Sequence, residues 1–145
     1  MFRVAILDVP FVDVACTMID STLPLTIQEW EEWGNPNEAC YFEYILSYSP
    51  VHNVKSNSIY PACLLTGGLY DPRVQYWEPL KFAAELRHKL DHHIGSENRT
   101  FFQKYPICVR IDLSCGHFAE SDRYKFLKEK AYHYAFLLDQ FDLSN

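Results

Sequence analysis

The chain has 145 residues with a formal net charge of −6, and 48% of its residues are hydrophobic. This length and composition fit one globular domain and exclude a wholly disordered chain. The acidic balance argues against nucleic acid as a partner, because phosphate binding needs clustered Lys and Arg. The apolar runs are too short to span a membrane and Asp8 interrupts the first of them, so we expect neither a transmembrane helix nor a signal peptide.

The cysteines indicate the compartment. They are odd in number and form no Cys-x-x-Cys pair, which predicts free thiols in a reducing environment rather than a disulfide framework. We therefore expect a cytoplasmic protein. The five residues are Cys16, Cys40, Cys63, Cys108 and Cys115.

Hydrophobic periodicity predicts alternating strands and helices. The predicted strands are apolar runs, mostly rich in β-branched residues, and the predicted helices have apolar residues three or four positions apart. Three such strands separated by helices indicate an α/β fold with a parallel sheet. In chain order the elements are a strand over 3–9, a short helix or irregular segment over 11–22, helices over 27–33 and 38–48, a strand over 62–66, a helix over 76–90, a strand over 107–113 and a helix over 122–141.

Residues at the helix ends support these boundaries. Thr26 precedes Glu29 by three residues, which is the spacing of a capping box at the start of helix 27–33. Gly34 is expected to end that helix, and Pro79 suits the first turn of helix 76–90. A group of aromatic residues is expected to form core and pocket wall: Trp30, Trp33, Tyr41, Tyr44 and Tyr48.

Titratable residues follow two of the predicted strands. Asp71 lies beyond the second strand and His117 beyond the third. Loops at the carboxyl ends of parallel strands meet at one edge of the sheet, so these two side chains can lie close together. Asp before His is also the chain order of α/β-hydrolases, in which the carboxylate orients the imidazole. Solvated or structural roles for both residues remain open, because a lone Asp and a lone His in loops more often have such roles. The nucleophile is also not evident, since none of the five glycines frames one in a Gly-x-Ser-x-Gly pattern.

Two further groups have alternative interpretations. His88, Asp91, His92 and His93 could bind a metal, but a helix end and polar loop of this kind is more typical of surface histidines. Cys115 could act as a thiolate beside His117, although a cysteine so near in sequence cannot readily take the nucleophile's position. We therefore predict no metal site and no cofactor.

Several segments together resemble the prolyl oligopeptidase family of serine peptidases, and most closely its oligopeptidase B and prolyl-endopeptidase-like branch. They extend over nearly the whole chain in the family's order. The segments are Val9-Pro10-Phe11-Val12-Asp13, Thr17-Met18-Ile19-Asp20, Leu23-Pro24-Leu25-Thr26, Glu29-Trp30-Glu31-Glu32-Trp33-Gly34-Asn35-Pro36, Tyr48-Ser49-Pro50, Tyr60-Pro61, Gly68-Leu69-Tyr70-Asp71-Pro72-Arg73-Val74, Tyr76-Trp77-Glu78-Pro79 and Gly116-His117.

The resemblance implies an α/β-hydrolase fold in which Asp71 and His117 are the catalytic acid and histidine. Arg73 stands where the prolyl branch holds a substrate carbonyl. Glu29 and Glu31 match acidic residues that bind a basic side chain in the oligopeptidase B branch. The alternative for these glutamates is a solvated helix face that includes the capping box.

The resemblance also implies that residues 1–145 are the C-terminal portion of a catalytic domain that cleaves short peptides. The family's N-terminal β-propeller and its nucleophilic serine have no counterpart here, so they are expected in a missing N-terminal part of the same enzyme. The isolated chain is then expected to be inactive. The alternative is a catalytically inactive remnant or a binding fragment.

Overall fold

The computed structural model describes residues 2–56, 58–91, 105–117 and 123–142. These residues contain a parallel sheet in which β2 lies between β1 and β3. Parallel neighbours need crossover connections, and helices provide them here. The α/β fold with a parallel sheet is therefore confirmed. The strands are β1 (Val4–Asp8), β2 (Ala62–Gly68) and β3 (Ile107–Asp112).

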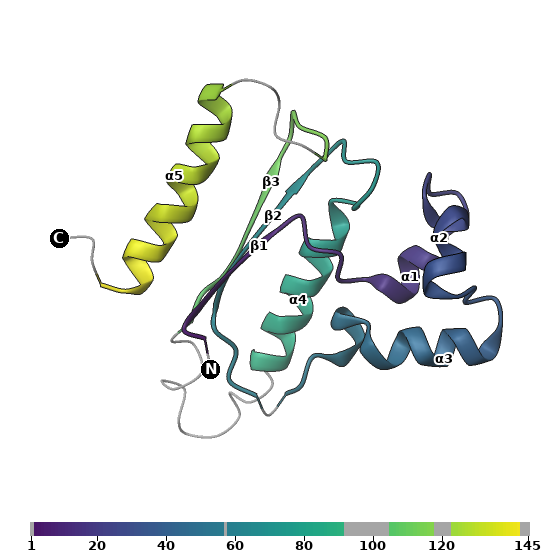
Figure 1. Ribbon diagram of the computed structural model, residues 1–145. Helices are drawn as coiled ribbons and strands as arrows, with labels where there is room; N and C mark the ends of the chain where they lie inside the picture. Colours follow the sequence, from purple (N-terminus) through teal and green to yellow (C-terminus); the bar gives the residue numbers. More distant parts are fainter. Residues whose placement is uncertain (1, 57, 92–104, 118–122, 143–145) are drawn as a thin grey trace.

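Helices cover both faces of this sheet in the described part of the chain. They are α1 (Val14–Ile19), α2 (Thr26–Trp33), α3 (Ala39–Tyr48), the 3₁₀-helix η1 (Pro50–Asn53), α4 (Trp77–Asp91) and α5 (Arg123–Gln140). Helix α4 packs on one face of the sheet and α5 lies on the other, whereas α1, α2 and α3 gather beyond α4 (Figure 1). Among the helices described, none is both long and apolar enough to cross a membrane.

The strand register brings the three carboxyl ends to one edge of the sheet. Asp8 pairs with Thr66, Thr66 pairs with Arg110, and Gly68 pairs with Asp112. The loops that leave β2 and β3 therefore start side by side. This is the arrangement in which open α/β sheets place functional groups.

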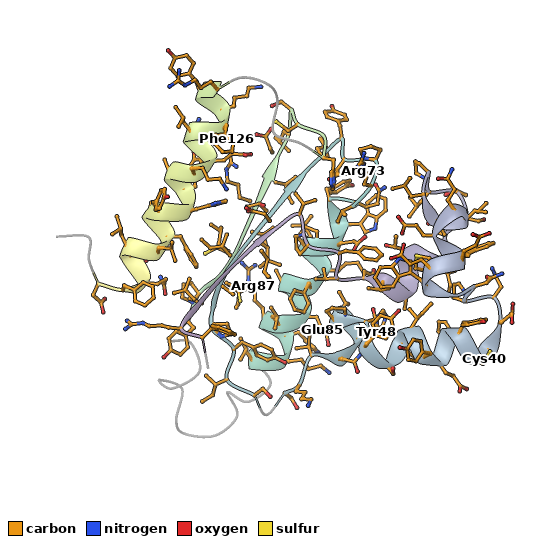
Figure 2. The ribbon with its side chains drawn as sticks, viewed as in Figure 1. Cys40, Tyr48, Arg73, Glu85, Arg87 and Phe126 are labelled. Carbon is orange, nitrogen blue, oxygen red and sulfur yellow. The ribbon has the colours of Figure 1, made fainter. Side chains whose placement is uncertain are left out.

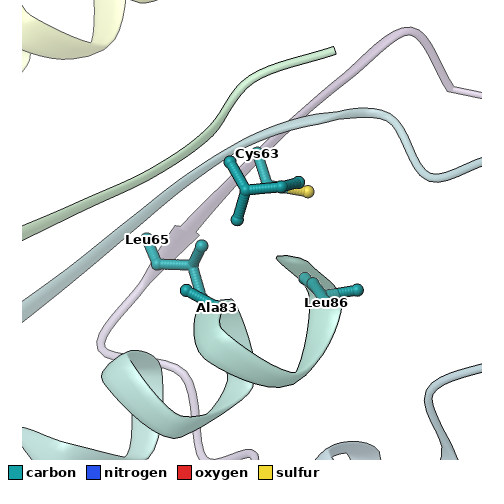
Figure 3. Close-up of a cluster of buried hydrophobic side chains, with 5 residues drawn as sticks. Cys63, Leu65, Ala83 and Leu86 are labelled. Atoms are coloured by element: carbon teal, nitrogen blue, oxygen red, sulfur yellow. The ribbon is translucent and has the colours of Figure 1, made fainter. Parts of the chain in front are cut away.

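The main core lies between the sheet and α4. Cys63 and Leu65 of β2 pack against Ala83 and Leu86 of α4, and Ile107 of β3 completes the cluster (Figure 3). Burial raises the pKa of the Cys63 thiol to about 11, so this cysteine serves as a small apolar side chain. The apolar run that predicted the second strand thus reflects burial in the centre of the sheet.

A second core joins α1 to α3. Met18 and Ile45 are its most buried members, and the Trp30 indole donates a hydrogen bond to the Met18 carbonyl at 2.9 Å. The aromatic residues predicted to form core and pocket wall differ in burial. Trp30 and Trp33 pack against this core, whereas Tyr41 and Tyr44 are exposed.

The capping box predicted at the start of α2 is wrong. Thr26 lies inside the helix, Leu25 precedes it, and the buried Thr26 hydroxyl donates instead to the Thr17 carbonyl at 2.9 Å. A tertiary hydrogen bond to α1 has therefore replaced the local one. The predicted stop is confirmed, because Gly34 ends α2 with a φ of 92°, a conformation that other residues rarely adopt.

Candidate active site

Asp71 and His117 meet at the carboxyl edge of the sheet. His117 Nδ1 lies 2.8 Å from Asp71 Oδ2, and because a carboxylate only accepts, Nδ1 carries the proton of this hydrogen bond. The Asp71 side chain is 0% exposed and the His117 side chain is 25% exposed. A buried carboxylate thus holds a partly exposed imidazole.

The loop after β2 fixes the Asp71 carboxylate. Its Oδ1 atom accepts hydrogen bonds from the backbone N–H groups of Arg73 and Val74, at 2.8 and 3.1 Å. One oxygen is therefore held by the turn itself and the other by His117. This is local Asx-turn chemistry, in which an Asp side chain bonds the backbone two or three residues on.

The loops after β2 and β3 are held against each other by backbone contacts. Tyr70 N–H donates to the Cys115 carbonyl at 3.1 Å, and Leu69 N–H donates to the Asp112 carbonyl at 2.8 Å. Gly68 permits this approach, because a Cβ atom there would lie 2.5 Å from the Gly116 carbonyl oxygen. The Asp71–His117 geometry therefore depends on a residue without a side chain.

A pocket lies beside the Asp71 loop, between that loop and α2. Glu29 lines it together with Glu32, and Arg73, which is labelled in Figure 2, lines it from the loop after β2. Because the Arg73 backbone binds the Asp71 carboxylate, the pocket adjoins the Asp71–His117 pair. Glu31 is exposed and does not line this pocket. The structure therefore brings Glu29 and Arg73 together and leaves Glu31 apart from them.

Cys115 and the histidines around the end of α4 are the alternative functional residues considered from the sequence. Cys115 is buried, its carbonyl binds the neighbouring loop, and its Sγ lies 3.9 Å from Ser114 Oγ, all of which fit a structural residue. His88 is exposed on α4, whereas His92 and His93 lie outside the described residues.

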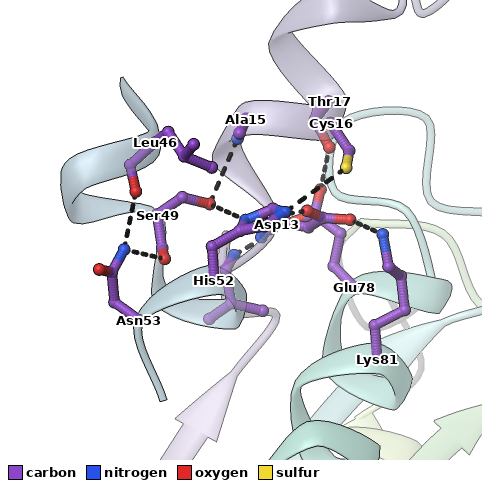
Figure 4. A network of polar contacts seen from close by, with 11 residues as sticks. Asp13, Ala15, Cys16, Thr17, Leu46, Ser49, His52, Asn53, Glu78 and Lys81 are labelled. Carbon is purple, nitrogen blue, oxygen red and sulfur yellow. Dashed lines mark hydrogen bonds and ion pairs between the residues drawn. The ribbon is translucent and has the colours of Figure 1, made fainter. Parts of the chain in front are cut away.

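A buried polar network was not predicted from the sequence. Glu78, at the start of α4, is 0% exposed and accepts hydrogen bonds from Val12 N–H, Asp13 N–H and the Thr17 hydroxyl at 2.8–2.9 Å (Figure 4). Burial raises the pKa of Glu78, although these three donors oppose the shift. The network joins residues more than 60 positions apart, so no local spacing could have indicated it.

Cys16 borders this network. Partial burial raises the pKa of the Cys16 thiol, and the neighbouring Asp13 carboxylate raises it further. A thiol of this kind is poorly suited to act as a nucleophile, because the thiolate is the reactive form. The Asp71–His117 pair therefore remains the chemical centre that the described residues define best.

A parallel sheet with an Asp and a His in successive strand-end loops has the fold and the chain order of α/β-hydrolases. The chain belongs to the prolyl oligopeptidase family, whose model matches residues 1–144.

Individual relatives agree with this assignment. Dipeptidyl aminopeptidase BI of Pseudoxanthomonas mexicana is 42% identical over 144 residues, which are 99% of this chain and 18% of that protein. The prolyl endopeptidase-like protein of Gallus gallus is 38% identical over 140 residues, 94% of this chain and 19% of that protein. The solved structure of oligopeptidase B from Leishmania major is 46% identical with a TM-score of 0.83, and the match covers 99% of this chain and 18% of that one.

A second oligopeptidase B structure, from Trypanosoma brucei with covalently bound antipain, is 44% identical with a TM-score of 0.79. Here the match covers 99% of this chain and 19% of that one. The chain thus spans about one fifth of the length of these relatives.

Proposed function

We propose that this chain supplies the general base and the orienting carboxylate of a serine peptidase that cleaves short peptides. The observation that carries the proposal is the 2.8 Å hydrogen bond from His117 Nδ1 to the buried Asp71 carboxylate. It directs Nε2 away from Asp71, on the edge of the ring where a nucleophile must lie. Family membership supports the same class of reaction.

The nucleophile would come from outside residues 1–145. No glycine pair here frames a serine as Gly-x-Ser-x-Gly, the strained turn that exposes the nucleophile in this fold. In the proposed reaction, His117 Nε2 takes the serine proton as the hydroxyl attacks the peptide carbonyl. Asp71 stabilises the resulting imidazolium, and Nε2 then gives the proton to the leaving amine.

Two substitutions test this assignment in the protein at its full natural length. His117→Ala should lower kcat by roughly 10⁶-fold, the scale seen when a triad histidine is removed. Asp71→Asn should lower it by roughly 10⁴-fold, because the amide no longer favours the tautomer with a proton on Nδ1. His88→Gln, on the exposed face of α4, is the control and should leave peptide turnover unchanged. Full turnover by His117→Ala would overturn the assignment.

We further propose that the pocket beside Asp71 selects peptides with a basic residue on the amino side of the cut bond. Glu29 supplies a half-buried carboxylate there, which can accept charge-assisted hydrogen bonds from Arg or Lys. Arg73, which lines the same pocket, would position a substrate carbonyl, because its guanidinium stays charged and offers several donors. Glu31 is exposed and lies outside the pocket, so we expect it to contribute less than Glu29 to binding the basic side chain.

A matched pair of substitutions separates the two glutamates. Glu29→Gln should lower kcat/KM for an arginyl peptide by at least tenfold, since loss of a charged hydrogen bond costs about 1.5–3 kcal/mol. Glu31→Gln should have a smaller effect, because its side chain is exposed to water. A neutral peptide serves as the reference substrate for both variants. If both variants keep the arginyl preference, the specificity proposal fails while the Asp71–His117 proposal stands.

A further inference from the structure

Asp13 has a buried oxygen without a hydrogen-bond partner. The side chain is 0% exposed; its Oδ2 atom pairs with Lys81, whereas Oδ1 is the unsatisfied buried side-chain atom within the described ranges. A buried carboxylate oxygen is costly to leave unpaired, by about 1–3 kcal/mol or more. A cation bound beside Oδ1 would offset this cost.

Two metal-binding side chains surround that oxygen. Asp13 directly precedes α1, and Cys16 lies one helical turn further along the same face. His52 approaches from η1, with Nδ1 at 3.9 Å from Asp13 Oδ1 and Nε2 at 4.0 Å from Cys16 Sγ (Figure 4). One ligand atom from each of the three residues lies within 4.8 Å of the others.

Those two distances involve different nitrogens of the His52 ring, so one ring nitrogen must serve for both neighbours; with one atom from each residue, the three ligand atoms lie within 4.8 Å of one another. Zinc bonds of about 2.0–2.3 Å place neighbouring ligand atoms roughly 3.3–3.8 Å apart. Small side-chain rotations would close the remaining difference, and Cys16 and His52 are both exposed enough to rotate. Thiolate, imidazole and carboxylate together are a ligand set that zinc prefers, whereas calcium and magnesium prefer oxygen alone.

Neighbouring polar side chains contact two of the three candidate ligands, His52 and Asp13. Ser49 Oγ lies 3.0 Å from His52 Nδ1, which leaves Nε2, the nitrogen facing Cys16, for a metal. A hydrogen bond on the far nitrogen is the usual way in which a ligating histidine is oriented. Lys81 pairs with the other oxygen of Asp13 and also interacts with the Cys16 thiol, so its ammonium group must turn away from Sγ when an ion binds through Sγ and Oδ1.

We propose that Asp13, Cys16 and His52 bind a zinc ion, with water in the fourth position. The thiol proton of Cys16 leaves to solvent when the metal binds. The ion would fasten α1 to η1 and satisfy the buried Asp13 oxygen. The site shares no residue with the Asp71–His117 pair, and its role is structural.

The test uses the protein at its full natural length, stripped of metal by a chelator. Zn²⁺ is titrated in competition with a chromophoric chelator, and Co²⁺ is added separately to detect thiolate-to-cobalt absorption. Cys16→Ser and His52→Ala remove one ligand each, and Cys40→Ser and His88→Gln are matched controls at exposed positions. Circular dichroism checks that every variant is folded. Asp13 is kept, because its removal would leave Lys81 without its carboxylate.

A second measurement needs no variant. Iodoacetamide alkylation of Cys16 and Cys40, two exposed thiols in one molecule, is followed by peptide mass spectrometry with and without Zn²⁺. Zinc should slow alkylation of Cys16 and leave Cys40 unchanged.

We expect one equivalent of zinc, a cobalt–thiolate band that Cys16→Ser abolishes, and at least a 10–100-fold weaker affinity in both ligand variants. The two control variants should bind as the parent does. Absence of the cobalt band, equal zinc affinity in Cys16→Ser, or equal alkylation of both cysteines would each overturn the proposal. None of these readouts depends on peptidase activity.

Discussion

Asp71 owes its orientation to three hydrogen bonds that come from two loops. Two are local, from the backbone of Arg73 and Val74, and one comes from His117, 46 residues further along. The local bonds are readable from the sequence, since Asp-Pro is a frequent turn former. The contact with His117 was inferred from strand order, and the structure places the two side chains in hydrogen-bond distance.

Glu78 offers a prediction at the same scale. Its carboxylate accepts from three donors, whereas the amide of Glu78→Gln has only one oxygen and turns its NH₂ group toward a donor. In acidic buffer the variant should lose about 1–3 kcal/mol of unfolding free energy, the cost of buried groups left unpaired. Chemical denaturation followed by circular dichroism measures this loss. Glu85→Gln, at a half-buried position on α4, is the control.

The same residue predicts a pH dependence. Burial raises the pKa of Glu78 above its ordinary value of 4.5, so the folded state favours the protonated acid. Its stabilising contribution is then fully present below pH 4.5 and is lost as pH rises through the higher folded value. The stability difference between the parent and Glu78→Gln should therefore shrink between acidic and neutral pH. A difference that grows with pH would contradict this account.

At the scale of elements, the end of β2 governs how the two loops meet. Gly68→Ala would place a Cβ atom 2.5–2.6 Å from the carbonyl oxygens of Gly116 and Cys115, so the backbone of one loop must shift. A displacement of about 1 Å at a catalytic pair can lower the rate by roughly 10²-fold. We expect this loss in kcat/KM for the full-length protein.

Gly67→Ala is the matched control for that substitution. Its Cβ would meet only the side chains of Ile111 and Pro79, at 3.2 and 3.3 Å, and these lie away from the loops. Gly67→Ala should therefore keep most of the activity, and thermal melting reports the stability of both variants. Equal activity in the two variants would show that the Gly68 contact does not set the geometry.

Much of this element pattern could be predicted because it is local. Apolar runs indicated the three strands, and Gly34 indicated the end of α2. Thr26 was misjudged because its hydroxyl bonds to the Thr17 carbonyl, a tertiary contact that local spacing does not reveal. The partners of Asp13 likewise could not be predicted from the sequence, because Glu78 and Lys81 lie more than 60 residues further along the chain.

At the scale of the whole molecule, the chain exposes surfaces that ordinarily pack against something. Strand β1 pairs with β2 on one side, and no strand among the described residues pairs with its other edge. Helix α5 leaves Phe126, Leu127 and Tyr134 about half exposed or more. Apolar residues at helical spacing ordinarily face a core or a partner surface. Their exposure agrees with a chain that spans about one fifth of its relatives' length.

In the proposed reaction, His117 activates a serine that lies outside residues 1–145. A serine-directed fluorophosphonate probe tests it most directly, applied to the protein at full natural length and to residues 1–145 alone. We expect rapid labelling of the full-length protein, labelling slower by at least about 10³-fold in His117→Ala, and no labelling of residues 1–145 alone. Labelling of residues 1–145, or an unchanged rate in His117→Ala, would contradict it.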